Sequence, residues 1–358
     1  MHFHSSLVGR RELNTQKTPL QASMLIQMLT IAIGAFTLLG CSGPEVRPDR
    51  FTWELAEERL KSGIFQQVNT PPEYIVLEGY PSEHVQAISS GIDVAREYFG
   101  NFGPVRVYIL GKTDGAEGTS EAYQNFVEEY CRLRTEWAPS GFEEDCFGDS
   151  AQRLVDVAKS GGQEAFQSMV IYTEPPYSEL IFINADDWGE TDMPLRGIHE
   201  YTHVFQCVFP ESPGWLMEGG AVFFEAWLGS KNGWVDFRTA MHRSLWSAQQ
   251  GRDRGKGLSD MEYTRDLPEE MIPFHRSIAY DMGVWAVTFM ISRSNDGSVS
   301  DFRDQFYPLV KTEGWQRAVS IYAGTVDIDE FYRLFEEFLG QPLKEQLDLL
   351  KTLKDGSR

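Results

Sequence analysis

The chain has 358 residues, of which 42% are hydrophobic and 13% are aromatic. This size and composition are enough for a folded core and suit one large domain or two modest ones. The formal net charge is −21, which argues against a nucleic-acid partner, because binding a polyanion needs clustered lysine and arginine. We therefore expect a globular protein with a solvated acidic surface and no nucleic-acid partner.

The amino-terminal segment has the composition of a targeting signal. Residues 18–43 contain no charged side chain, and Arg10, Arg11 and Lys17 precede them. The apolar part at residues 24–39 has the length of a signal-peptide core. The alternative is a single uncleaved membrane span, since about 20 apolar residues suffice to cross a bilayer. Either interpretation places the folded part of the chain outside the cytoplasm.

The end of this apolar segment reads Leu38-Leu39-Gly40-Cys41. It resembles the bacterial lipobox, in which the cysteine is lipidated and becomes the first mature residue, and Ser42 resembles a signal for sorting to the outer membrane. The resemblance implies a lipoprotein signal peptide at residues 1–40 and a lipid on Cys41. It also implies an exported protein that is anchored in the outer membrane of the envelope and faces the periplasm.

After a short tether at residues 41–50, residues 51–193 are expected to form an α/β subdomain. The pattern of apolar residues predicts, in order, a strand at 74–78, a helix at 81–99, a strand at 105–110 and a helix at 120–137.

Two further strand-like runs, residues 168–173 and 179–184, are separated by Glu174-Pro-Pro-Tyr-Ser178 and predict a hairpin. An edge strand at this position could pair with an extended peptide by strand addition. We nominate residues 179–184 as that edge. The alternative is an ordinary internal strand.

The segment from Gly197 to Phe205 contains the motif H-E-x-x-H. On a helix, His199 and His203 lie on one face about 5–6 Å apart, so both imidazoles can face one metal ion. Glu200 lies one step round the helix and can reach a metal-bound water without ligating the metal, as a general base must. The alternative is a chance match, but buried histidines and a buried glutamate without partners would each cost several kcal/mol. The motif therefore predicts a zinc site.

The third zinc ligand is sought in the segment 213–221, which is expected to begin the next helix. Glu218 is the best candidate, because two histidines and one carboxylate leave a fourth position open for water, which is a catalytic arrangement. Glu225 lies two turns further along the same face. It either orients a histidine from behind or is solvated.

The three remaining cysteines are assigned separately. Cys131 and Cys146 flank a polar stretch that could form a loop closed by a disulfide in an exported protein, and the sequence leaves open whether they are bonded. Cys207 follows His203 by four residues. On a straight helix, His199, His203 and Cys207 would span about 12 Å, which is too far for one ion. We expect Cys207 to be a buried free thiol.

Residues 194–358 are expected to form an all-helical subdomain that carries the zinc site. The predicted helices cover residues 194–208, 215–228, 235–250, 277–293, 301–322 and 327–350. The predicted fold class is therefore α+β. A strand-containing N-terminal half with a mixed sheet is followed by an all-helical C-terminal half, with the active-site helix at the junction.

His199-Glu200-Tyr201-Thr202-His203, followed by Trp215-Leu216-Met217-Glu218-Gly219-Gly220-Ala221, resembles the gluzincin metallopeptidases. The resemblance is to the peptidase MA-like group and, more distantly, to the aminopeptidase N-like enzymes. Their pattern is H-E-x-x-H and then W-L-x-E-G-x-A. The resemblance implies one zinc ion per chain, held by His199, His203 and Glu218, with Glu200 as the general base.

A third match is Tyr280 in Ala279-Tyr280-Asp281-Met282-Gly283, which resembles the family's Tyr-x-x-Gly helix. The resemblance implies that Tyr280 stabilises the oxyanion, a role that a phenolic hydroxyl can fill. The alternative is an ordinary tyrosine at a helix start with a satisfied hydroxyl.

The resemblance covers about residues 172–339, but residues 181–193 have nothing like the G-x-M-E-N segment with which the aminopeptidases grip a free amino terminus. This departure favours internal cleavage. The expected function is therefore an exported zinc endopeptidase that acts on peptides or proteins, including cell-wall peptide. The alternative is a zinc-containing surface lipoprotein that binds a partner or an envelope polymer without cleaving it.

Overall fold

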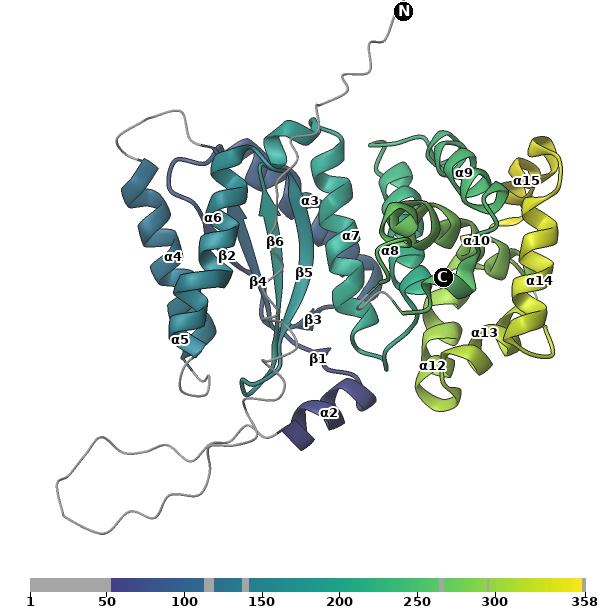
Figure 1. The fold of residues 1–358 in the computed structure, drawn as a ribbon, viewed down its shortest axis with the longest axis horizontal. Coiled ribbons are helices and arrows are strands. Elements are labelled where there is room, and N and C mark those ends of the chain that lie inside the picture. The colour runs from purple at the N-terminus through teal and green to yellow at the C-terminus, as the bar shows by residue number, and fades with distance from the viewer. Residues whose placement is uncertain (1–52, 113–118, 137–141, 264–266, 295, 356–358) are drawn as a thin grey trace, which may run out of the picture. The chain divides into compact units, whose positions relative to one another are not determined.

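A computed structural model describes residues 53–112, 119–136, 142–263, 267–294 and 296–355 (Figure 1). The predicted signal peptide, the lipidated Cys41 and the tether lie outside these residues. Among the helices in the described ranges, none combines the length and the apolar character that crossing a bilayer requires.

The N-terminal half contains strands and helices. Its elements are α2 (Trp53–Ser62), β1 (Gln66–Gln67), β2 (Glu73–Val76), α3 (Ser82–Phe99), β3 (Phe102–Gly103), β4 (Val105–Leu110), α4 (Thr119–Thr135), α5 (Phe142–Asp145), the π-helical turn η1 (Cys146–Ser150), α6 (Ala151–Ser160), β5 (Glu164–Val170), β6 (Tyr177–Ile183) and the 3-10 turn η2 (Ala185–Trp188). The predicted strands, helices and hairpin of this half are confirmed, with ends that differ by a few residues. The sequence analysis does not predict α2 or α6, although α6 buries apolar residues at helical spacing.

Four strands form a mixed sheet in the order β2-β4-β6-β5. β2, β4 and β6 are parallel, and β5 is antiparallel to β6. The nomination of residues 179–184 as the edge is wrong, because β6 pairs with β4 on one side and with β5 on the other. The physical reason is that β6 is buried at every position, and a strand covered on both faces reads as a continuous apolar run. The two edge strands are β2 and β5, and the side chains of β5 are mostly half-buried.

Helices cover both faces of this sheet. Figure 1 shows α4, α5 and α6 on one side, and α3 and α7 (Asp192–Gln206) on the other. α7 lies directly against α3 because two glycines leave room for the backbones. A Cβ atom at Gly91 would lie 1.8 Å from the carbonyl oxygen of Pro194, and one at Gly197 would lie 2.4 Å from that of Ile88. This close packing fixes the position of the helix that carries the H-E-x-x-H motif.

The C-terminal half is helical, as predicted. After α7 its elements are α8 (Gly214–Lys231), α9 (Phe237–Asp253), η3 (Leu258–Met261), η4 (Ile272–Phe274), the π-helical turn η5 (Arg276–Met282), α10 (Gly283–Arg293), α11 (Val299–Asp301), η6 (Phe302–Phe306), α12 (Tyr307–Glu313), α13 (Trp315–Ala323), α14 (Ile328–Leu339), α15 (Leu343–Leu349) and η7 (Leu350–Thr352).

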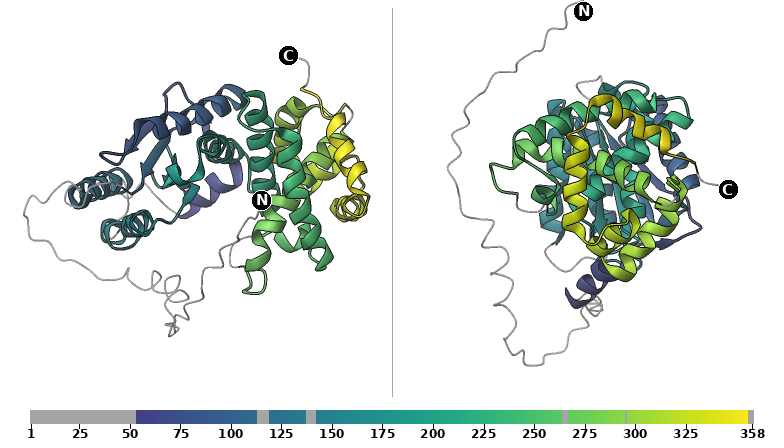
Figure 2. Two further views of the ribbon diagram at one scale, coloured as in Figure 1. Left: turned by 90° about the horizontal axis from the view of Figure 1, so that it is seen from above. Right: turned by 90° about the vertical axis from the view of Figure 1, so that its right-hand side faces the viewer.

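Two predicted helices of this half are interrupted. The helix predicted at 301–322 breaks at Gly314, whose φ of 77° suits glycine and ends a helix. The helix predicted at 327–350 breaks between Gly340 and Pro342. The two halves lie side by side (Figure 2), and α7 lies between the sheet and α8 (Figure 1). The fold is thus α+β, with a small sheet in the N-terminal half and helices in the C-terminal half.

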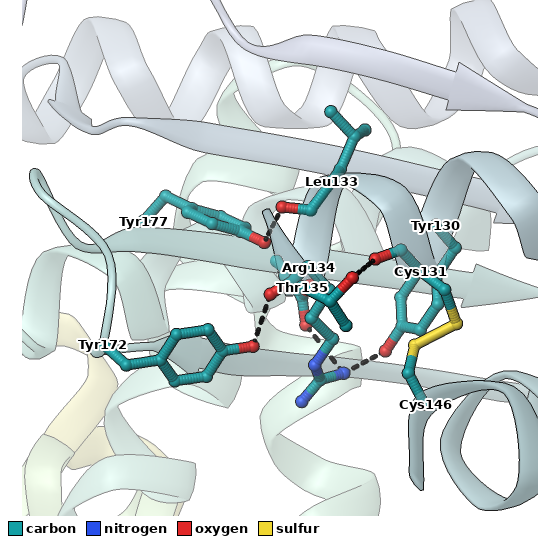
Figure 3. The surroundings of a disulfide bond; sticks show 9 residues. Tyr130, Cys131, Leu133, Arg134, Thr135, Cys146, Tyr172 and Tyr177 are labelled. Atoms are coloured by element: carbon teal, nitrogen blue, oxygen red, sulfur yellow. Dashed lines mark hydrogen bonds and ion pairs between the residues drawn. A yellow bond between two sulfur atoms is a disulfide. The ribbon is translucent and has the colours of Figure 1, made fainter. Parts of the chain in front are cut away.

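Cys131 and Cys146 form a disulfide (Figure 3). The bond joins α4 to the start of η1, and the segment between them includes the short helix α5. Near the end of α4, the Tyr172 hydroxyl donates a hydrogen bond of 2.7 Å to the carbonyl oxygen of Arg134 (Figure 3). Carbonyl groups in the last turn of a helix have no partner within the helix, so this contact ties the end of α4 to the β5–β6 hairpin.

Candidate metal centre

α7 brings the motif residues to the inner side of a cleft. His199, Glu200 and His203 are only 3%, 4% and 8% exposed. The two imidazole rings lie one helical turn apart, with centroids 5.0 Å from each other. The predicted helical spacing is therefore what the structure shows, and both histidines face the same point.

Glu218 of α8 lies between the two imidazoles. Its Oε2 atom is 3.4 Å from Nε2 of His199 and 3.5 Å from Nε2 of His203. Two ligand atoms on a tetrahedral zinc ion are separated by about 3.4 Å when the bonds are about 2.1 Å long. Oε2 is also buried and has no hydrogen-bond partner in the described part of the chain, a situation that costs free energy unless another group satisfies the atom. These three residues therefore fit a metal ion.

The two glycines after Glu218 explain how this residue reaches the site. A Cβ atom at Gly219 would lie 2.2 Å from the carbonyl carbon of Gly283, so the absence of a side chain lets α8 lie against the junction of η5 and α10. A Cβ atom at Gly220 would lie 2.8 Å from Nε2 of Gln206. The E-G-G sequence thus makes room for the helix that carries Tyr280 and for the amide of Gln206.

Trp215 anchors the start of α8. Its ring is fully buried and stacks against Phe331 of α14 with a centroid separation of 6.0 Å. Its indole N–H donates to the hydroxyl of Tyr332 at 3.3 Å. The tryptophan of the W-L-x-E-G segment therefore fixes α8 to the C-terminal helices, and it places Glu218 one turn further on.

The carboxylate of Glu225 contacts the His199 ring nitrogen that does not face Glu218. Oε2 of Glu225 lies 3.0 Å from Nδ1 of His199. This contact favours, of the two predicted alternatives for Glu225, the one in which it orients a histidine. The same oxygen lies 3.4 Å from Nη1 of Arg196. With Nδ1 bound to Glu225, the other ring nitrogen of His199 faces Glu218.

Gln206 contacts Nδ1 of His203, as Glu225 contacts Nδ1 of His199. Its Oε1 lies 2.8 Å from Nδ1 of His203, and its amide nitrogen donates to the carbonyl oxygen of Met217 at 2.9 Å. Because the amide nitrogen is committed to Met217, Oε1 accepts the Nδ1–H proton, and Nε2 of His203 is left free to face Glu218. The sequence analysis does not single out Gln206. The available signal is its position three residues after His203, on the same helix face.

The side chains of the cluster shift one another's pKa values. Burial works against a charge on His199, but the contacts with Glu218 and Glu225 raise its pKa to about 9. Burial likewise works against the charge of Glu218, yet His203 and His199 hold its pKa far below the usual range. The cluster thus favours a positive charge at the point where the three side chains meet.

The cluster opens into a cleft of about 1090 Å³. The cleft is lined by residues of α7, by Glu218, by Tyr280 and by several residues of β5, namely Glu164, Ala165, Phe166, Gln167 and Met169. Cys207 also lines it and is a free thiol, as predicted, but it is partly exposed rather than buried. Burial of the sulfur raises the pKa of Cys207 to about 12, so the thiol is not a nucleophile at neutral pH.

Tyr280 lies in η5 and is close to His199 and Glu218. Its ring is nearly parallel to that of His199, with centroids 6.0 Å apart. Burial and the neighbouring charge of Glu218 raise the pKa of Tyr280, so the hydroxyl keeps its proton and can act as a donor. π-Helical turns such as η5 occur often at functional sites. The structure therefore brings together all five residues predicted for the catalytic site: His199, Glu200, His203, Glu218 and Tyr280.

Searches of protein-family models, of curated proteins and of solved structures find no match to this chain. The class of the site is therefore argued from its own residues. Two histidines on one helix and a glutamate on the next have three donor atoms within 4.8 Å of one another. Two imidazole nitrogens and a carboxylate oxygen are donors that suit a zinc ion.

Proposed function

We propose that the protein is a zinc-dependent peptidase that cleaves polypeptides internally. The observation that carries the proposal is the convergence of Nε2 of His199, Nε2 of His203 and Oε2 of Glu218 in the wall of a large cleft. Three protein ligands leave one position of a tetrahedral zinc ion open for water. The neighbouring Glu200 and Tyr280 supply the groups that amide hydrolysis needs besides the metal.

Each residue has a distinct role in the proposed reaction. Bound zinc supplies Lewis acidity and a water whose pKa is lowered toward about 7. Glu200 accepts a proton from the attacking water as the general base. Tyr280, whose hydroxyl keeps its proton, donates a hydrogen bond to the developing oxyanion. Glu225 and Gln206 hold the Nδ1 atoms of the two histidines, so that the ligand nitrogens stay aligned.

The position of the edge strand β5 favours a polypeptide as the substrate. β5 is one of the two edge strands of its sheet, and five of its residues line the cleft. The free N–H and C=O groups of an edge strand can pair with an extended chain. A substrate bound along β5 would pass the zinc site with chain continuing on both sides, which supports internal cleavage of peptides or proteins, including cell-wall peptide.

The cellular location is part of the same proposal. We infer an exported protein, anchored through a lipid on Cys41 in the outer membrane and facing the periplasm. The Cys131–Cys146 disulfide supports export, because such bonds persist in oxidising compartments.

Removing the metal tests this function directly. The zinc-loaded protein is expected to cleave an unfolded protein substrate, to lose this activity in a chelator and to regain it when one equivalent of zinc is restored, since the open coordination position depends on the ion. Product formation is followed by mass spectrometry, with added magnesium as the control. Full zinc occupancy without cleavage of unfolded proteins or cell-wall peptides would contradict the proposal and favour the non-catalytic binding lipoprotein.

Replacing Gln206 by leucine is expected to weaken zinc binding by about 10- to 100-fold, the usual effect of losing a partner that orients a metal ligand. Leucine cannot accept the Nδ1–H proton of His203, so that ring loses its fixed orientation. Zinc affinity is measured by competition with a chromophoric chelator. The matched control is Gln249→Leu, which removes a hydrogen bond to Gln346 in another part of the helical half. Equal affinities in both variants would show that Gln206 does not orient the ligand.

A further inference from the structure

Two arginines, Arg196 and Arg276, line the cleft that contains the donor cluster of His199, His203 and Glu218. We propose that their guanidinium groups bind a carboxylate of the substrate, so that cleavage is directed to a bond beside an acidic side chain or near a free carboxyl terminus. This inference rests on the proposed peptidase function and names the chemical class of its substrate.

Arg196 is placed by the helix that carries the zinc ligands. It precedes His199 by three residues on α7, so the two side chains lie on the same face. One of its terminal nitrogens, Nη1, is 3.4 Å from Glu225, and 29% of the side chain is exposed. A guanidinium carries five N–H donors in a rigid fork, and the contact with Glu225 occupies only part of it. Within the described residues, the only recorded hydrogen-bond partner of the Arg196 side chain is Glu225, so its other donors can contact a ligand in the cleft.

Arg276 lies over the ring of Tyr280. Its guanidinium carbon is 4.8 Å from the centre of the Tyr280 ring, and the residue is exposed. In the part of the chain that the structure describes, no ion pair joins Arg276 to a carboxylate. Stacking on an aromatic ring restricts the orientation of a guanidinium and leaves its N–H edge free for a two-pronged contact with a carboxylate. By contrast, the cleft residue Arg153 is already paired with Glu164 at 2.6 Å.

The charges around the two arginines are mixed. Glu225, Glu200 and Asp192 lie near Arg196, and Glu225 and Asp281 lie near Arg276. The chain as a whole carries −21, so it does not attract acidic peptides in general. A preference for a carboxylate should therefore appear at one defined position relative to the cleaved bond, and not as a general preference for acidic substrates.

Matched peptides test this inference. Peptides that differ only by glutamate or glutamine at each position around one cleavage site test the acidic side chain, and peptides with a free or an amidated carboxyl terminus test the chain end. Because hydrogen bonds to a charged group are strong, kcat/KM is expected to favour the carboxylate on the order of 10- to 100-fold at one position. Arg276→Gln should remove this preference. The matched control Arg243→Gln, at an exposed site on α9, should keep it.

A binding measurement separates this inference from the peptidase proposal. The zinc-loaded variant Glu200→Gln, with and without Arg276→Gln, is titrated with the same peptides by calorimetry. Tighter binding of the carboxylate peptide that is lost with Arg276→Gln supports the inference, and it does so even if the parent cleaves nothing and the peptidase proposal fails. Cleavage with equal binding of acid and amide peptides would overturn the inference alone. A preference that persists in Arg276→Gln would also overturn it.

Discussion

Replacing His203 by alanine is expected to lower the zinc content from about one ion per chain to almost none. His203 supplies one of the three ligand atoms, and its Nε2 lies 3.5 Å from Oε2 of Glu218. Two remaining ligands do not make a zinc site, because protein zinc sites need at least three. The parent and the variant, spanning Pro44 to Arg358 and purified without a histidine tag, are compared by elemental analysis.

His242→Ala is the matched control, because His242 is exposed on α9 and takes no part in the cluster. This variant should keep the zinc of the parent. If His203→Ala retained a full equivalent of zinc, the ion would be bound elsewhere in the protein. If the parent itself bound none, α7 would be only a buried scaffold, and the peptidase proposal would have to be dropped.

The H-E-x-x-H part of the site is predictable because helix geometry is local. Spacing alone places His199 and His203 on one face and Glu200 beside them, and the structure shows this arrangement. Glu218 lies on another helix, and spacing alone does not predict its contact with both histidines. That contact depends on Gly219, where a Cβ atom would lie only 2.2 Å from the carbonyl carbon of Gly283, so a side chain there would keep α8 away from that residue. The W-L-x-E-G context points to Glu218 because it includes this glycine.

The parts of the fold that the sequence analysis predicts wrongly or leaves out depend on contacts between distant segments. The order of strands is set by pairing across the sheet and cannot be read from one segment alone. Residues 179–184 are therefore predicted as an edge, although they overlap the internal strand β6. The run Leu180–Ile183 is nevertheless apolar at every position, which is typical of a strand buried on both faces. Arg276 lines the same cleft as the donor cluster because η5 packs against α8, and no local pattern indicates that packing.

Replacing Glu200 by glutamine is expected to reduce kcat by about 10²- to 10⁴-fold, the usual contribution of a general base, while the zinc content stays at that of the parent. Glutamine has nearly the same size as glutamate, so the buried site can keep its packing. Its amide has no basic lone pair that could take the proton of the attacking water. Cleavage rates are measured on an unfolded protein substrate, and zinc content is measured on the same samples.

Glu211→Gln is the matched control, because Glu211 also lines the cleft but is exposed and lies outside the donor cluster. Its variant should cleave at a rate close to that of the parent, so a loss confined to Glu200→Gln cannot come from the charge of the cleft alone. Cleavage retained in Glu200→Gln would disprove the proposed mechanism. Loss of zinc in that variant would instead show that Glu200 is a ligand, and the proton would then have to be taken by another group.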